Sequence, residues 1–384
     1  MAGYVFIGNS SKPSMEKNNS REPVKPGNVS IPCIEAALNL GYEVYLGTNR
    51  YKPEELECSY PVHLYDSHTY RSITAFSDNM VAFRNLSNVV KKGNIEVIHC
   101  NTPVGGMIGR LVGRKYHVKK VIYTAHGFHF YKGAPLFNRT VFKWAEQLMA
   151  RWTDAIITMN QEDYEAAKKF KLKKDGKIFL VHGVGITLSE FVNPQNREEK
   201  RNELGLKPDE IALISAGDLV ARKNYRVAIE AIAKANDPRL HYFICGRGPE
   251  LENLKKLAEE KKVLDNIHFL GFRNDVKELF FAADIFLFTS LQEGLPRSMM
   301  EAMACGLPCI ASSIRGNVDL LENGVGGYLN SVNDIDGFAK SIITIANDYE
   351  VRKKMMKNNL NRIKNYDVEI VKKEIEKIYK EVIG

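Results

Sequence analysis

The chain has 384 residues, which is too many for one ordinary hydrophobic core and enough for two domains of about 150 to 200 residues. Apolar residues make up 44% and charged residues 26%, as in folded soluble proteins, and neither a signal peptide nor an apolar run near 18 residues is found. The net charge of +8 favours an anionic partner, unless it reflects a lysine-rich surface without function.

The six cysteines form no metal-binding or redox pattern. None belongs to a CxxC pair, and Cys305 and Cys309 have no second Cys/His pair at zinc spacing. We interpret all six as reduced, mostly buried thiols of a cytosolic protein. We therefore expect a cytoplasmic protein that, where it works at a membrane, lies peripherally on the inner face.

Short apolar runs recur along the chain, each followed by a turn and an amphipathic helix. Strands that alternate with helices favour parallel sheets covered on both faces. In the first half we expect strands at residues 4–7, 43–46, 97–100, 120–124, 155–158 and 178–181, and helices at 31–39, 105–114, 137–150 and 161–170. In the second half we expect strands at 211–215, 241–245, 267–270, 285–288, 308–311 and 327–329, and helices at 225–235, 250–261, 276–281, 298–304 and 335–347.

This order predicts an α/β protein with two tandem, doubly wound, Rossmann-like domains. We place the first domain at residues 1–187 and the second at 188–366, with the polar segment 188–200 as the linker. The charged C-terminal helix, residues 367–384, is expected to pack on either domain, the first being preferred. The Ser-, Lys-, Asn- and Pro-rich segment 10–27 follows the first strand, and we interpret it as a long mobile loop at the ligand-facing edge.

Ligands of open parallel sheets bind at the carboxyl ends of the strands. In the second half these ends are followed by "AGDLVARKN", "GRGPE", "GFRND" and "TSLQEGLPRSMMEAMACG". Glycines allow close backbone approach, Lys and Arg attract phosphate, and a helix start offers free N–H groups to the same anion. One edge of the second sheet is therefore predicted to bind a phosphorylated ligand.

Two carboxylates in this edge, Glu293 and Glu301, lie eight positions apart. They are not the close carboxylate pair of a hydrolase. They are better placed to hold different hydroxyls of one long ligand. Glu301 can hold a vicinal diol such as that of a ribose, and Glu293 can hold the hydroxyls of a sugar. The helix start between them, with Arg297 nearby, can face a diphosphate.

The segment "EGLPRSMMEAMACGLP" resembles the retaining glycosyltransferases of family 4, whose two Rossmann-like domains face each other across a cleft in the GT-B architecture. Eight further segments fit in the same order and cover nearly the whole chain: "CNTPVGGMIGRL", "YTAHGFHFYKGAP", "TDAIITMNQEDYEAAKKF", "VHGVGI", "GDLVARKN", "CGRGPELENL", "LGFRNDV" and "IRGNVDLLENGVGGYL". The "TAHGFHFYKGAP" version is similar to the subgroup that builds bacterial capsular and exopolysaccharide repeat units on a lipid carrier.

The resemblance implies roles for the residues that match its motifs. Lys223 is expected to contact the donor diphosphate, with Arg222 supplying a second charge. Glu301 is expected to bind the ribose diol and Glu293 the donor sugar, which His126 is expected to face from the first domain. We expect Lys223, Glu293 and His126 to be the catalytic residues.

Further positions are expected to bind the donor. Gly294, Leu295 and Arg297 would serve the sugar and phosphate through backbone groups. The loop 271–276, with Arg273, would hold the base, and we include Gly246 although a single G-x-G turn is weak evidence. No metal ion or other cofactor is expected, and the D-x-D of Asp334 and Asp336 is interpreted as a helix cap.

Two positions depart from the family pattern. Many members have an Arg that pairs with the Lys on phosphate where this chain has Asp218, so either Arg222 replaces it or Lys223 acts with the helix N-terminus alone. Thr187 stands where Asp or Asn often follows the "GVGI" turn, which puts a local turn or hydroxyl contact in doubt.

The implied activity is transfer, with retention, of a hexose or N-acetylhexosamine from a UDP-sugar to a glycan acceptor linked to a lipid diphosphate, in cell-surface polysaccharide biosynthesis. Two alternatives stay open: a non-catalytic nucleotide-sugar-binding partner of another transferase, and a GT-B sugar-nucleotide epimerase, which would form product from the donor alone. Nucleic-acid binding has no motif in its favour.

Residues 110–151 hold nine Lys or Arg residues and one acid, Glu146, interleaved with aromatic residues. This mixture favours contact with an anionic membrane surface and a lipid-diphosphate acceptor. The alternative is a helix that packs its aromatic face and solvates its basic face.

Overall fold

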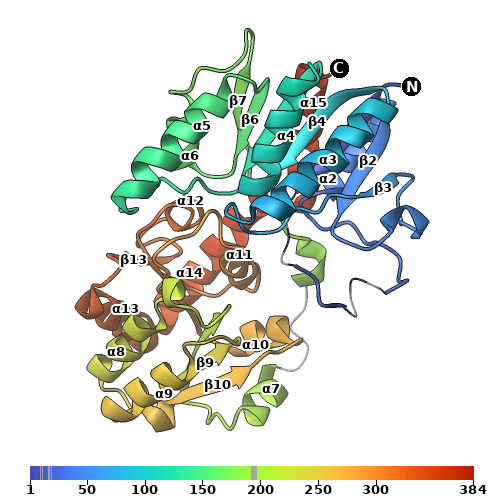
Figure 1. Cartoon of the computed structure of the whole chain (residues 1–384). Coiled ribbons are helices and arrows are strands. Elements are labelled where there is room, and N and C mark those ends of the chain that lie inside the picture. Colours follow the sequence, from blue (N-terminus) through green and yellow to red (C-terminus); the bar gives the residue numbers. More distant parts are fainter. Residues whose placement is uncertain (9, 11, 16–17, 19, 192–196) are drawn as a thin grey trace. The chain divides into compact units, whose positions relative to one another are not determined.

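The structure is a computed structural model that describes residues 1–8, 10, 12–15, 18, 20–191 and 197–384 (Figure 1). The chain forms two compact units: the first comprises Met1–Gly185 and Glu369–Gly384, the second Ile186–Val368. The boundary expected after residue 187 lies close to the division after Gly185. Along the described part of the chain, no helix has both the length and the apolar character needed to cross a bilayer.

The first unit is built on a seven-stranded sheet in which all neighbouring strands are parallel. From one edge to the other, the strands are β3 (His63–Asp66), β2 (Glu43–Thr48), β1 (Gly3–Ile7), β4 (Ile95–Asn101), β5 (Lys120–Ala125), β6 (Ala155–Thr158) and β7 (Lys177–Leu180). Strand β3 is absent from the predicted set. Strands β2 and β3 are added on one side of β1, and β4 to β7 are added on its other side. The sheet is therefore doubly wound, as predicted.

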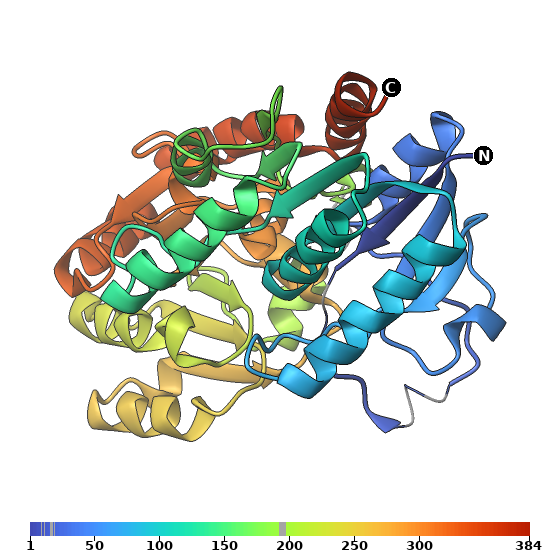
Figure 2. The ribbon, with the colours of Figure 1, turned by 45° about the horizontal axis from the view of Figure 1, so that its top comes forward.

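The helical elements of the first unit are α2 (Ile31–Asn39), η1 (Pro53–Glu55), α3 (Phe76–Lys92), α4 (Pro103–Lys115), the π-helical segment η2 (Asn138–Phe142), α5 (Lys143–Ala150), α6 (Gln161–Ala167) and the C-terminal α15 (Val368–Val382). Helices α3 and α4 lie side by side on one face of the sheet (Figure 2). Sequence patterning predicts all of these helices except α3 and the short η1, with η2 and α5 predicted as one helix.

Three glycines let α4 lie directly on the sheet. A Cβ atom at Gly106 would come within 2.4 Å of the Tyr123 ring, one at Gly109 within 2.5 Å of the Cys100 Cβ, and one at Gly113 within 2.6 Å of the Val121 Cγ2. These spacings of three and four residues place the glycines on one helix face. The close approach brings the start of α4 to the carboxyl ends of β4 and β5.

Helix α15 covers the opposite face of the first sheet. Its Tyr379 hydroxyl lies 2.6 Å from the Tyr4 hydroxyl of β1 and 2.5 Å from Nδ1 of His99 on β4. The other ring nitrogen of His99 lies 2.7 Å from the Thr124 hydroxyl. Because burial lowers the pKa of His99 to about 3, this interior network is held by neutral groups.

The second unit has a six-stranded parallel sheet in the order β10-β9-β8-β11-β12-β13. Its strands are β8 (Ile211–Ala216), β9 (Leu240–Cys245), β10 (Ile267–Gly271), β11 (Ile285–Phe288), β12 (Cys309–Ser312) and β13 (Gly327–Asn330), all at predicted positions. Strands β9 and β10 are added on one side of β8, and β11, β12 and β13 on its other side. Two apolar clusters, one on each face, bury the sheet.

The helical elements of the second unit are η3 (Leu188–Phe191), α7 (Arg197–Glu203), η4 (Ala221–Lys223), α8 (Tyr225–Ala235), α9 (Leu251–Glu260), η5 (Leu264–Asn266), α10 (Val276–Ala282), α11 (Arg297–Ala304), α12 (Asn317–Leu320), α13 (Ile335–Asn347), α14 (Tyr349–Arg362) and η6 (Ile363–Tyr366). The expected linker 188–200 thus contains η3 and the start of α7, and its residues 192–196 lie outside the described residues. Residues 11, 16, 17 and 19 of the expected loop 10–27 also lie outside them.

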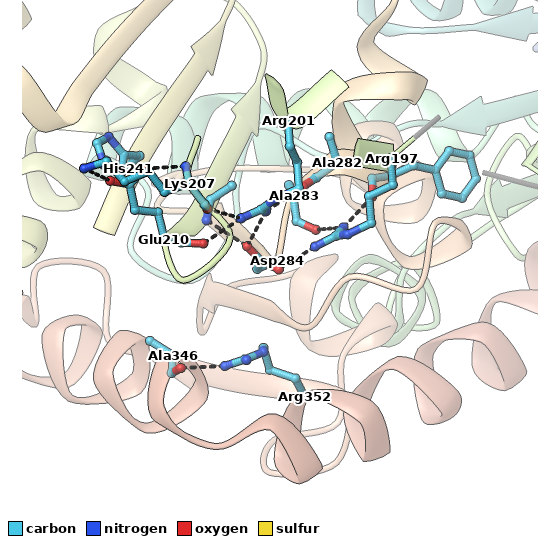
Figure 3. Close-up of polar contacts among 12 residues, drawn as sticks. Arg197, Arg201, Lys207, Glu210, His241, Ala282, Ala283, Asp284, Ala346 and Arg352 are labelled. Carbon is cyan, nitrogen blue, oxygen red and sulfur yellow. Dashed lines mark hydrogen bonds and ion pairs between the residues drawn. The ribbon is translucent and has the colours of Figure 1, made fainter. Parts of the chain in front are cut away.

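Asp284, which precedes β11, anchors α7 to the second sheet. Its carboxylate accepts hydrogen bonds from Arg197 at 2.6 Å, from Arg201 at 3.0 Å and from the backbone N–H of Ala212 at 2.9 Å (Figure 3). Three donors satisfy this carboxylate, so its burial carries little cost. The contact ties α7, which begins within the expected linker, to the strand that leads into the candidate site.

Candidate donor-sugar site

The turn after β8 is joined by hydrogen bonds to the segment after β11. The N–H of Leu291 donates to the Arg222 carbonyl at 2.8 Å, and the Thr289 hydroxyl donates to the carbonyls of Lys223 at 3.2 Å and Asn224 at 2.9 Å. Asn224 starts α8 with a φ of +54°, a left-handed conformation that Asn tolerates. These contacts hold the side chains of Arg222 and Lys223 against Glu293.

Glu293 receives both cations on one oxygen. The Lys223 Nζ lies 2.8 Å and the Arg222 Nη1 3.4 Å from Oε1 of Glu293. The side chains of Lys223 and Glu293 are only 11% exposed, whereas Arg222 is 50% exposed. Lys223 also lies 4.7 Å from the centre of the Phe288 ring. Lys223 is therefore firmly positioned, and Arg222 is the more exposed and more distant second charge.

The backbone of residues 293–295 rests on the turn before α12. Arg315, which is 5% exposed, donates from Nε to the Glu293 carbonyl at 2.9 Å. Gly316 has a φ of +81°, and a Cβ there would lie 2.3 Å from the Gly294 carbonyl oxygen, so only glycine fits. Sequence reasoning matched this "IRGN" segment to the family but gave Arg315 no role.

Helix α11 begins directly after this segment. Pro296 precedes it, no side chain caps its first turn in the described part of the chain, and its first N–H groups remain available to an anion. The Nε of Arg297 lies 2.7 Å from Oε1 of Glu301, one turn along the helix. This pair is partly exposed, and such pairs contribute little stability, so Glu301 can exchange Arg297 for ligand hydroxyls.

Gly246 lies where two backbone turns meet. A Cβ atom at Gly246 would come within 1.9 Å of the Gly217 carbonyl oxygen, and its own N–H donates to the Gly271 carbonyl at 2.7 Å. The position therefore has a packing reason for glycine. Donor binding by Gly246 stays a prediction.

Arg273 lies in an ion cluster that shares no residue with the Lys223–Glu293 pair. Its guanidinium contacts Asp275 at 2.5 Å and Glu203 at 2.9 Å, and Lys200 contacts the same two carboxylates. The hydrogen bonds from Arg273 hold the pKa of Asp275 well below its ordinary range. These contacts hold the loop 271–276 in place. Binding of the nucleobase of the donor by Arg273 stays a prediction.

His126 belongs to the first unit and follows β5. Its Nε2 lies 3.0 Å from Oδ1 of Asn101, at the end of β4, and sequence reasoning overlooked Asn101. Burial lowers the pKa of His126 to about 4, so the ring is neutral near pH 7 and suited to hydrogen bonding with hydroxyls. Both residues line an open cavity of about 810 Å³, large enough for a sugar with a phosphate group.

Comparison with known proteins identifies the family. The model of Glycosyltransferase Family 4 matches residues 33–183, and that of Glycosyl transferases group 1 matches residues 196–362. The protein EpsD of Bacillus subtilis (strain 168) is 34% identical over 283 residues, which cover 72% of this chain and 74% of EpsD. The chain belongs to glycosyltransferase family 4. It is a transferase, and its two sheets are the two halves of a GT-B fold.

Two further proteins are similar to this glycosyltransferase. The UDP-Gal:alpha-D-GlcNAc-diphosphoundecaprenol alpha-1,3-galactosyltransferase of Escherichia coli is 32% identical over 301 residues, 77% of each chain. The crystal structure of Alr3699/HepE from Anabaena, in complex with UDP, has a TM-score of 0.78 and 17% identity and covers 99% of this chain and 100% of that one. The second likeness shows the fold alone.

The glycosyltransferase thus brings most of the predicted donor residues together in its second unit. Arg222, Lys223 and Glu293 meet at one carboxylate oxygen, and Arg297 pairs with Glu301 on the adjoining helix. Asp218, which stands where many family members have Arg, is exposed beside the same turn. His126 lies in the first unit, so the structure does not group it with these residues.

No metal cluster is found in the described part of the glycosyltransferase. The residues that the structure describes contain no group of three or more His, Cys, Asp or Glu side chains that could hold an ion. Asp334 instead caps α13, as its carboxylate accepts from the Gly337 N–H at 2.9 Å, and Asp336 pairs with Lys234. The D-x-D therefore serves the helix start, as predicted.

Proposed function

We propose that this glycosyltransferase transfers a hexose or N-acetylhexosamine from a UDP-sugar, with retention of anomeric configuration, to a glycan acceptor linked to a lipid diphosphate. The observation that carries the proposal is the buried contact of Lys223 with Glu293 beside the uncapped start of α11. The name of the similar Escherichia coli galactosyltransferase, which contains both UDP-Gal and a diphosphoundecaprenol, supports the donor and acceptor classes. We place the reaction in cell-surface polysaccharide biosynthesis.

In this mechanism, residues of the second unit bind the donor. Glu293 holds the donor sugar, Glu301 holds the ribose diol, and the departing diphosphate is met by Lys223, Arg222 and the N–H groups at the start of α11. These donors are fixed before the reaction, so little reorganisation accompanies the developing charge. The acceptor hydroxyl attacks the anomeric carbon on the face that UDP leaves, its proton passes to the departing phosphate, and no metal ion takes part.

A donor screen tests this proposal. The protein is incubated with UDP- and GDP-sugars in the presence of a chelator, and release of nucleoside diphosphate is followed with and without a lipid-diphosphate-sugar acceptor. We expect release from one UDP-sugar, faster with acceptor and unchanged by the chelator. Product formed from the donor alone without release would instead indicate an epimerase, and binding without release a non-catalytic partner. Loss of transfer with chelator would contradict metal independence.

The basic and aromatic stretch 110–151 is only partly at the surface. Arg110 is fully buried, and Phe128 and Phe130 are 2% and 9% exposed, so the interpretation of the whole stretch as a surface is wrong for these residues. Residues 132–144 hold the exposed large apolar side chains of this stretch. These side chains and their exposed fractions are Leu136 75%, Phe137 61%, Val141 44% and Trp144 64%, and the exposed cations of the same residues are Lys132, Arg139 and Lys143.

We propose that residues 132–144 contact an anionic membrane surface, where exposed apolar side chains enter the interface and cations meet lipid phosphates. The double variant Phe137→Ser/Trp144→Ser is expected to float with phosphatidylglycerol vesicles at least fivefold less than the unaltered protein. Tyr349→Ser, at a 65% exposed position of the second unit, is the matched control. Equal flotation with anionic and neutral vesicles would count against the proposal.

A further inference from the structure

The cavity of the first unit has the features of an anion site rather than of a site for sugar hydroxyls alone. Among the described residues that line it are Gly8, Arg71, Asn101, Thr102 and His126. None of its described lining residues carries a carboxylate, in contrast to Glu293 and Glu301 of the donor site. Arg71 brings a full positive charge to the rim, and it forms no ion pair or hydrogen bond with any residue that the structure describes.

The start of α4 faces this cavity through Thr102, Pro103 and Val104. Thr102 offers no side-chain cap, Pro103 has no N–H, and the first backbone bond of the helix runs from the Gly106 N–H to the Thr102 carbonyl at 2.7 Å. The N–H groups of Val104 and Gly105 have no partner in the described part of the chain. A 13-residue helix therefore presents its positive end to the cavity.

Asn101 supplies an independent observation that points to a ligand. The residue is 2% exposed and lines the cavity, and its Oδ1 is used by His126. Its Nδ2, however, finds no hydrogen-bond partner among the described residues. A buried amide N–H without an acceptor costs about 1–3 kcal/mol, so such groups are rare unless a ligand or water completes them.

The backbone before α4 is also held in an unfavourable conformation. Thr102 has a φ of +63° and a ψ of 168°, which a β-branched residue rarely adopts and which costs about 1–3 kcal/mol. On the other side, a Cβ at Gly105 would lie 3.1 Å from the Gly8 backbone, so two bare backbone segments meet at the cavity wall. Glycine at position 105 therefore lets the turn after β1 pack directly on the start of α4.

We propose that this cavity binds a phosphate group of the acceptor, held by the Arg71 guanidinium, the Asn101 amide and the N–H groups at the start of α4. The inference rests on the proposed function, in which the acceptor sugar is carried on a diphosphate. A phosphate fixed here places the attached sugar beside His126. The site therefore selects acceptors that carry the sugar directly on phosphate over neutral glycosides.

The test compares two acceptors of the same sugar, a short-chain lipid diphosphate and a neutral alkyl glycoside. Arg71→Gln is expected to raise KM for the diphosphate acceptor about tenfold, which is about 1.4 kcal/mol. KM for the neutral glycoside and for the donor should stay within twofold, and Arg71→Lys should restore most of the loss. Arg84→Gln, an exposed position of α3 outside the cavity, is the matched control. An equal change with both acceptors, or a change in donor KM, would overturn the inference.

A second measurement does not depend on transfer. With UDP present to occupy the donor site, inorganic pyrophosphate should bind the unaltered protein at least fivefold more tightly than the Arg71→Gln variant, measured by calorimetry. Equal binding by the two proteins would also overturn the inference. If no acceptor supports transfer but pyrophosphate binding depends on Arg71, the proposed function fails and the anion site stands.

Discussion

Replacement of Lys223 by alanine is expected to lower kcat for sugar transfer by two to three orders of magnitude, about 3–4 kcal/mol of barrier. The Lys223 side chain is only 11% exposed and its ammonium group lies 2.8 Å from Glu293, so its charge acts with little solvent screening. No nearby group can replace it, because Arg222 is half exposed and lies farther from the same carboxylate. The measurement is steady-state release of nucleoside diphosphate at saturating donor and acceptor.

Arg222→Ala is the matched comparison, since it removes the other cation of the same carboxylate. Because the Arg222 side chain is half exposed, we expect its removal to lower kcat by less than about tenfold. Circular dichroism of both variants should show an unchanged fold, because neither Lys223 nor Arg222 belongs to the apolar clusters that bury the second sheet. A kcat for Lys223→Ala within about twofold of the unaltered enzyme, less than half a kcal/mol of barrier, would show that Lys223 does not stabilise the leaving group.

Most of the two sheets could be predicted because their strands are buried, and buried strands are continuous apolar runs. The missed strand, β3, is an edge strand of four residues in which two polar residues flank the apolar pair, so it carries no such run. Helix α3 was missed for a related reason. Its buried positions include Asn79 and Ser87, which weaken the apolar stripe that marks a helix.

The grouping of the candidate donor residues could be predicted where they are close in sequence. The spacing of Glu293, Arg297 and Glu301 alone places them around one helix start. Arg315 was missed because it acts through its contact with a backbone carbonyl, which leaves no trace in residue types. The ion cluster of Arg273 was missed because its partner Glu203 lies 70 positions away along the chain.

The charge of Arg110 could not be interpreted from composition, because the sequence does not show which cations of a basic stretch are buried. Arg110 is 0% exposed, and its Nη1 lies 2.7 Å from Glu146 while its Nε donates to the Gly106 carbonyl at 2.8 Å. The guanidinium also stacks 3.9 Å from the centre of the Tyr123 ring. A residue that resembled part of a membrane-facing surface instead fastens α5 to α4.

Arg110→Ala is expected to lower the free energy of unfolding of the first unit by about 3–5 kcal/mol, because it leaves the Glu146 carboxylate without its partner and opens a cavity. Both tryptophans of the chain, Trp144 and Trp152, belong to the first unit. Their fluorescence during urea unfolding therefore reports the first unit without a contribution from the second.

Two further variants separate the buried charge from the buried volume. Arg110→Leu/Glu146→Leu removes both charges and is expected to regain a large part of the lost stability, as apolar replacements of buried ion pairs often do. Arg226→Ala breaks a half-exposed pair with Glu230 and should cost less than about 1 kcal/mol. A loss for Arg110→Ala as small as that for Arg226→Ala would contradict the assigned role. A double variant no more stable than Arg110→Ala would mean that packing on Tyr123, rather than the ion pair, holds the two helices together.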